Sequence, residues 1–165
     1  MAIVILFLDF DGVLHPDPCF DAQRLFEQAP RLGAVLEEFA EARLVLSTSW
    51  RTERSLPELC QPLGAPLAAR VIGVTPNFAD FAAPARLWPY RRQAECVEWL
   101  NAHGAAAREW IALDDRASLF APDCERLIEC DSRRGLDETG AGRLRFALLR
   151  ARRAEQRRRG AALAG

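Results

Sequence analysis

Lysine is absent from the sequence, so all 22 basic residues of the 165-residue chain are arginines. Without a side-chain amine, the protein cannot use Schiff-base catalysis or bind a phosphate through lysine. Glycine and proline number only ten each, and half of the residues are apolar. This composition excludes collagen-like, low-complexity and wholly disordered classes, and the length predicts one globular domain in which any functional cation is an arginine.

Long apolar runs are also missing. The longest, residues 2–8, is too short to span a bilayer, and the acidic residues after it do not resemble a signal-peptide cleavage site. The five cysteines are odd in number, widely spaced and contain no Cys-x-x-Cys pair, which argues against a disulfide framework and a zinc knuckle. We therefore expect a protein with reduced thiols, a cytoplasmic location and no membrane segment.

Charge is unevenly distributed along the chain. The net charge is −1, yet residues 143–165 hold eight arginines and one acid. Such a segment can bind nucleic acid or another polyanion, but few aromatic residues accompany these arginines, which favours a solvated helix end. We predict a single domain over residues 1–154 and a poorly ordered, arginine-rich tail over residues 155–165.

Apolar segments of two kinds alternate along the chain. Short segments rich in branched residues predict strands at residues 3–8, 43–47, 70–74, 109–113 and 126–130. Helical spacing or capping residues predict helices at residues 30–42, 53–61 and 90–103 and a final helix after Asp137. The alternation predicts an α/β fold of three Rossmann-like layers, with a mostly parallel sheet of about five strands and the first strand at its centre.

Polar residues follow three of these strands where each strand ends. They are Asp9 and Asp11, Thr48 and Ser49, and Asp114 and Asp115. Because parallel strands end at one edge of the sheet, these side chains should converge, and Gly12 permits a turn that brings Asp9 and Asp11 towards one ligand. Crowded carboxylates repel one another unless a cation lies among them, and oxygen ligands select Mg²⁺ over zinc. The sequence therefore predicts a Mg²⁺ site.

A phosphate group fits such a site. Mg²⁺ and an arginine would neutralise its charge, and a threonine hydroxyl would bind one of its oxygens. A carboxylate is then left for covalent chemistry and a second one for proton transfer. The residues thus indicate a phosphorylated substrate.

The motifs resemble those of a known family. Asp9-Phe10-Asp11-Gly12-Val13-Leu14 after an apolar strand is similar to the first motif of the haloacid dehalogenase-like (HAD) superfamily, in its aspartate-nucleophile phosphatase branch. The other three motifs follow in order as Leu46-Ser47-Thr48-Ser49, Arg92 and Leu113-Asp114-Asp115, so the resemblance covers about residues 3–131. Flanking residues, including Ser49-Trp50-Arg51 and Trp99-Leu100, resemble the HAD domains of Swiss Army Knife RNA-repair proteins.

The resemblance implies a role for each motif residue. Asp9 would attack phosphorus and form an aspartyl-phosphate, while Asp11 would protonate the leaving oxygen and then activate water. Thr48 would bind the phosphoryl group, with Ser47 or Ser49 as alternatives. Arg92 would hold the same charge, and Arg86 and Arg91 remain open for this role.

The metal ligands come from the same comparison. Mg²⁺ would be held by Asp9, by Asp114 and by the main-chain carbonyl of Asp11. Asp115 is either a further ligand or a helix cap, and Asp131 after the fifth strand is an additional acidic candidate. A dehalogenase is disfavoured because that branch generally lacks the second acid of the first motif, which this sequence has as Asp11.

Spacing limits the size of any insertion that could cover the site. Only 36 residues separate Asp11 from Thr48, and 43 separate Thr48 from Arg92. Both stretches are used by predicted strands, helices and loops, whereas an added cap domain needs roughly 50 residues of its own. The site is therefore expected to be uncapped and open to a bulky substrate such as a nucleotide or an RNA or DNA end, while the oligomeric state stays undetermined.

The sequence is also compatible with a second function. The chain could be a phosphate-binding or nucleic-acid-binding regulatory module with little turnover, although such a module would not need a proton carrier at Asp11. Near the motifs, His15 is expected to bond locally and Trp50 to pack on the sheet edge rather than stack on a nucleobase. Arg51 is a candidate contact for a phosphate.

Overall fold

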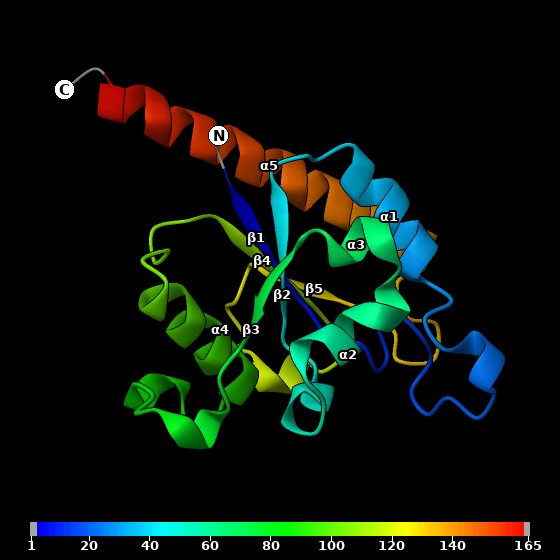
Figure 1. Ribbon diagram of the computed structural model, residues 1–165. Coiled ribbons are helices and arrows are strands. Elements are labelled where there is room, and N and C mark those ends of the chain that lie inside the picture. Colours follow the sequence, from blue (N-terminus) through cyan, green and yellow to red (C-terminus); the bar gives the residue numbers. More distant parts are fainter. Residues whose placement is uncertain (1–2, 164–165) are drawn as a thin grey trace.

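The computed structural model describes residues 3–163, and a five-stranded sheet with all neighbours parallel forms its centre (Figure 1). The strands lie in the order β3-β2-β1-β4-β5. Their bounds are β1 Val4–Leu8, β2 Ala42–Leu46, β3 Val71–Val74, β4 Trp110–Asp114 and β5 Leu127–Glu129. The predicted α/β class, the parallel sheet and the central position of the first strand are confirmed.

Burial on both faces explains why β1 is central. All five of its residues are buried, and it pairs with β2 from Val4 opposite Ala42 and with β4 from Ile5 opposite Trp110. Alternate side chains of β1 enter two separate apolar clusters, one on each face of the sheet. A strand that contacts apolar side chains on both faces has no polar positions, which matches the unbroken apolar run in the sequence.

Helices cover the two faces of the sheet and complete three layers (Figure 1). On one face, α1 (Ala29–Glu37) and α5 (Glu138–Leu163) contribute apolar residues to the larger cluster, together with the short helices α2 (Leu56–Cys60) and α3 (Ala65–Ala68). On the other face, α4 (Arg91–Ala102) contributes Cys96, Trp99 and Leu100. The described chain contains no additional domain over the carboxyl ends of the strands, as the motif spacing predicts.

Several boundaries differ from the sequence-based prediction. The helix expected over residues 30–42 ends at Glu37, because Ala42 begins β2 and pairs with Val4. The helix expected over residues 53–61 begins only at Leu56, since Glu58 accepts hydrogen bonds from the amide and hydroxyl of Ser55 and so caps the helix start. The helix α3 was not predicted, because its four residues contain a proline and are too few to show helical spacing.

The C-terminal segment is the largest difference. The predicted poorly ordered tail begins at residue 155, but α5 continues without a break to Leu163. Glu155 is fully buried, and its Oε1 accepts a hydrogen bond of 2.8 Å from the amide of Glu109, just before β4. Arg108 and Arg158 form ion pairs with its other oxygen. The predicted boundary at residue 155 therefore lies inside α5, and Glu155 links this helix to the residue that precedes β4. None of the helices within residues 3–163 has the length and apolarity needed to cross a bilayer.

Candidate active site

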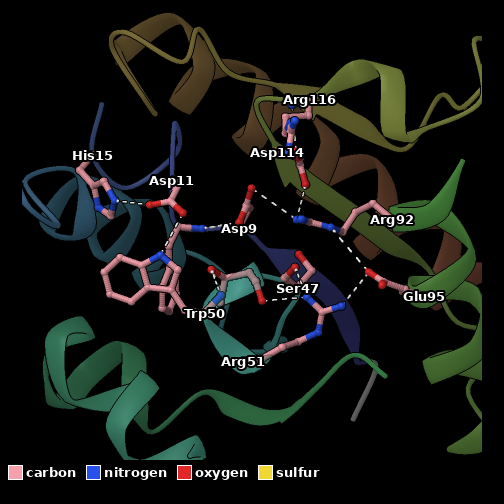
Figure 2. Close-up of polar contacts among 12 residues, drawn as sticks. Asp9, Asp11, His15, Ser47, Trp50, Arg51, Arg92, Glu95, Asp114 and Arg116 are labelled. Carbon is pink, nitrogen blue, oxygen red and sulfur yellow. Dashed lines mark hydrogen bonds and ion pairs between the residues drawn. The ribbon is translucent and has the colours of Figure 1, made fainter. Parts of the chain in front are cut away.

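Side chains from three strand ends meet at the carboxyl edge of the sheet (Figure 2). Asp9 directly follows β1, Ser47 and Thr48 are the first two residues after β2, and Asp114 is the last residue of β4. One carboxylate oxygen from each of Asp9, Asp114 and Asp115 lies within 4.8 Å of the other two. The topology thus brings three of the four predicted acids together, as expected for neighbouring parallel strands.

Asp9 lies at the centre of the group and is 4% exposed. Its Oδ1 accepts a hydrogen bond of 2.8 Å from the amide of Phe10, and its Oδ2 lies 3.3 Å from Nη1 of Arg92. Burial raises the pKa of the Asp9 carboxyl, and the positive charge of Arg92 opposes that rise. Its carboxylate is therefore held in a fixed orientation in a poorly hydrated place.

Asp114 and Asp115 show how strongly the acids repel one another. Burial, followed by the charge of Asp9, raises the pKa of Asp114 to about 7 and that of Asp115 to about 6. Asp114 is 1% exposed, and its two oxygens accept hydrogen bonds of 2.9 Å from the Arg116 amide and 2.8 Å from Arg92 Nη1. The protein therefore destabilises the ionised form of both carboxyls.

Gly12 allows Asp115 to approach the loop that follows β1. Its φ is +70°, a region that favours glycine. A Cβ built at this position would lie 2.1 Å from Oδ2 of Asp115. The glycine of the first motif therefore both permits the turn and leaves the space that the fourth-motif carboxylate occupies.

Arg92 is the arginine that reaches the acids. It lies in the first turn of α4, and its Nη1 lies between the Asp9 and Asp114 carboxylates. Burial lowers its pKa, but the charges of the two aspartates outweigh that effect and raise the pKa overall. The two alternatives lie elsewhere: Arg86 is exposed, and the Arg91 guanidinium lies 5.4 Å from the ring centre of Phe78.

Arg51 and Glu95 complete the site in a way that the sequence did not predict. Arg51 forms a 2.8 Å ion pair with Oε2 of Glu95, which lies 3.7 Å from Nε of Arg92. Its other donors bind four backbone carbonyls at the ends of β2 and β3, namely those of Ser47, Thr48, Thr75 and Pro76. All five N–H donors of this guanidinium are thus occupied within the protein, so Arg51 is not placed to bind a phosphate.

The two predicted phosphate-binding residues after β2 are placed differently. Thr48 is fully buried, and its Oγ1 accepts a hydrogen bond of 3.3 Å from the amide of Trp50. Ser49 is exposed, and its carbonyl accepts a hydrogen bond from the hydroxyl of Thr52. Of the pair, only Ser49 has substantial solvent-accessible surface at this edge.

The side chain of Asp11 turns away from the other acids (Figure 2). It lies between His15 and Trp50, and the hydrogen bond from His15 followed by that from Trp50 lowers its pKa despite partial burial. Its carboxylate is not among the clustered acids of the described chain, so the side chain is no candidate metal ligand in this arrangement. Asp131 also lies outside the cluster, because its oxygens contact the Arg133 amide and the Arg134 side chain.

The clustered acids suit a divalent cation bound by oxygen. Asp9, Asp114 and Asp115 bring three carboxylate oxygens within 4.8 Å of one another, and the Arg92 guanidinium pairs with two of these acids. Oxygen ligands are also what Mg²⁺ prefers, so the residues present fit this ion.

The metal-free protein should lose stability as the pH rises. The pKa of Asp114 is about 7 in the folded state, whereas the same group in the unfolded chain has its ordinary value near 4. The folded state therefore binds more protons between these values, and the free energy of unfolding falls over this window as the pH rises. We expect the Tm in EDTA to drop by several degrees from pH 5 to pH 8, measured by calorimetry.

Two controls accompany this prediction. Millimolar Mg²⁺ should raise the Tm more at pH 8 than at pH 5, because the cation binds the ionised acids. The variant Asp114→Asn should lose the share of the pH dependence that comes from Asp114, and most of the Mg²⁺ effect. A Tm that Mg²⁺ leaves unchanged at pH 8 would contradict a metal site here.

Comparison with known proteins gives one family. The model for the HAD domain in Swiss Army Knife RNA repair proteins matches residues 5–141, which include all four motif regions and the acids described above. Among curated proteins and solved structures, none matches the chain.

Proposed function

The chain belongs to the family of HAD domains found in Swiss Army Knife RNA repair proteins, and from this premise and the geometry of the site we propose that it is a Mg²⁺-dependent phosphatase that acts through Asp9. The observation that carries the proposal is the arrangement of Asp9 against Arg92 and the Asp114–Asp115 pair. It supplies a fixed carboxylate nucleophile, a buried guanidinium and a set of oxygen ligands at one edge of the sheet.

The reaction has two steps. A carboxylate oxygen of Asp9 forms a bond to phosphorus as the bond from phosphorus to the leaving oxygen breaks. Asp11, whose pKa is lowered in the substrate-free protein, must first take up a proton from solvent, which it then gives to that oxygen. Water then attacks the phosphorus of the aspartyl-phosphate, Asp11 takes the proton from the water, and the bond to Asp9 breaks. The products are the alcohol and inorganic phosphate, and both aspartates return to their starting state.

The remaining residues balance charge. Arg92 would neutralise the transferring phosphoryl group from the side on which it already contacts Asp9 and Asp114. Asp9, Asp114 and Asp115 would hold Mg²⁺, with the main-chain carbonyl of Asp11, and the ion would supply charge stabilisation for the phosphoryl oxygens. Glu95, which lies next to Nε of Arg92, would fix the orientation of the Arg92 guanidinium, and Arg51 would hold Glu95 in place.

A regulatory binding module is the second candidate function. The placement of Asp11 favours the enzyme. Its carboxylate is held by His15 and Trp50, apart from the clustered acids. A phosphate-binding module would have no need of such a separately positioned carboxylate. The enzyme is therefore the function that we propose first.

The open edge of the sheet fits a bulky phosphate ester, and we propose a nucleotide or an RNA or DNA end as the substrate. The basic part of α5 is not next to this site. Arg150, Arg153 and Arg157 line a groove with Arg126 beside the start of β4, and β4 runs roughly 13 Å from there to Asp114. These arginines could contact only the distant part of a long substrate whose terminal phosphate lies at Asp9.

Hydrolysis of phosphate esters with and without Mg²⁺ tests the function. We expect the protein to release phosphate from 4-nitrophenyl phosphate or from 5′- and 3′-phosphorylated oligonucleotides, with activity lost in EDTA and restored by added Mg²⁺. Failure on every one of these substrates, combined with unaltered Tm in Mg²⁺, would favour the binding module instead.

A further inference from the structure

The carboxylate of Asp11 is bound by two side-chain donors, one for each oxygen. Nε2 of His15 lies 2.9 Å from Oδ1, and Nε1 of Trp50 donates to Oδ2 at 2.9 Å. Figure 2 shows Asp11 between these two rings, while Asp9 lies towards Arg92. His15 comes from the loop after β1 and Trp50 from the turn after β2, so two separate segments determine where this carboxylate lies.

The hydrogen bonds of His15 fix its role as a donor. The backbone amide of Phe26 donates to Nδ1 of His15 at 3.3 Å, and because an amide can only donate, Nδ1 is the unprotonated nitrogen. The ring proton therefore lies on Nε2, which donates to Asp11. His15 is 1% exposed, so its ring is not placed to reach a leaving group.

Packing holds both donors in place. The ring of Phe26 lies edge-on to those of His15 and Trp50, with centroids 5.1 and 5.5 Å apart. Phe10 makes a similar contact with Trp50 at 5.6 Å, and the guanidinium of Arg54 lies 4.2 Å above the Trp50 ring. Rings confined in this way cannot turn without disturbing several neighbours, which makes the two N–H groups rigid supports.

We propose that His15 and Trp50 are positioning residues that hold the Asp11 carboxylate where it transfers protons in both steps. This inference rests on the proposed phosphatase function and deepens it. A proton transfer needs its donor and acceptor within hydrogen-bond reach, so a carboxylate that is free to rotate spends less time in the productive position. Neither ring touches the phosphate, and each acts on the reaction only through Asp11.

The leaving group provides the test. The value of kcat/KM reports the first chemical step. In that step Asp11 must protonate a poor leaving group such as an alkoxide. The stable 4-nitrophenolate leaves with hardly any need for this proton. Two variants remove one donor each: His15→Leu keeps nearly the volume of the side chain, and Trp50→Phe keeps an aromatic ring of smaller size. A third variant, His15→Gln, keeps an N–H donor close to the position of Nε2 and is the matched control.

We expect His15→Leu and Trp50→Phe to lower kcat/KM for an alkyl phosphate by about tenfold or more, a part of the roughly 100-fold or greater effect of general acid catalysis. For 4-nitrophenyl phosphate kcat/KM should change less than about threefold, while a burst of nitrophenolate appears because water attack on the intermediate becomes slow. His15→Gln should restore most of the loss. Calorimetry on each variant reports whether it folds.

Two results would overturn the inference, and they differ from failure of the function itself. An equal loss for both substrates in both variants would mean a merely structural role, and unchanged kinetics would mean no role. In either case the wild-type phosphatase activity stands. If the wild type hydrolyses neither ester and no phosphorylated oligonucleotide, the proposed function fails and the positioning role fails with it.

Discussion

Replacing Asp9 by asparagine should lower kcat for 4-nitrophenyl phosphate by about 10⁵-fold, on the scale of losses that follow removal of a catalytic nucleophile. The amide has the shape of the carboxylate but is a poor nucleophile, so the covalent step is lost. The fold should remain, because the variant removes a buried charge whose pKa is already raised by burial. Initial rates at saturating Mg²⁺ and a thermal melt measure the two effects separately.

A matched acid outside the cluster controls for the loss of charge. Asp131 follows β5 at the same edge of the sheet, and its carboxylate contacts only its own turn. Asp131→Asn should keep kcat within about twofold of the wild type. Turnover that survives in Asp9→Asn, or that is lost equally in Asp131→Asn, would rule out Asp9 as the nucleophile.

Replacing Arg92 by methionine should cost about 3 kcal/mol of unfolding free energy at pH 7.5 in the absence of Mg²⁺. Its side chain is 9% exposed and provides the contacts of 2.8 and 3.3 Å to Asp114 and Asp9. Breaking a buried ion pair from one side leaves uncompensated charge, which typically costs 3–5 kcal/mol unless the acids become protonated. Urea denaturation provides the measurement.

The pH dependence of this variant identifies the cause. Without the guanidinium the pKa of Asp9 should rise further, so lowering the pH to 5 should protonate the acids and recover a large part of the lost stability. Arg91→Met, at the exposed neighbouring position, should cost less than about 0.5 kcal/mol. A loss in Arg92→Met that is the same at both pH values would point to lost packing rather than unpaired charge.

The strand ends of this fold could be predicted well from the sequence. Continuous apolar segments identify buried parallel strands, and the acids directly after them must then meet at one edge. For this reason Asp9 and Asp114 were found from spacing alone. Arg92 could be placed at the site only by resemblance, with Arg86 and Arg91 as open alternatives. The reason is that an arginine side chain is long, so the position of its guanidinium depends on the partners that it contacts.

The parts that were missed depend on contacts between distant segments. Arg51 binds carbonyls at the ends of two strands, and Glu95 accepts from both the Phe78 amide and Arg51, which no local pattern indicates. Likewise the sequence predicted Asp11 as the proton carrier, with its main-chain carbonyl as a metal ligand, but it did not predict that His15 and Trp50 bind the Asp11 carboxylate. The arginine-rich end was predicted to be poorly ordered because its anchor, buried Glu155, is a single acid among eight arginines.

Trapping the covalent intermediate tests the central claim most directly. The protein would be mixed with 4-nitrophenyl phosphate and Mg²⁺, quenched within a turnover and treated with borohydride, which reduces an aspartyl-phosphate to the corresponding alcohol. Peptide mass spectrometry should find this reduced residue at position 9, and only when both substrate and Mg²⁺ were present. Turnover without modification at position 9, or with modification at Asp11 or Asp114, would contradict the proposed role of Asp9.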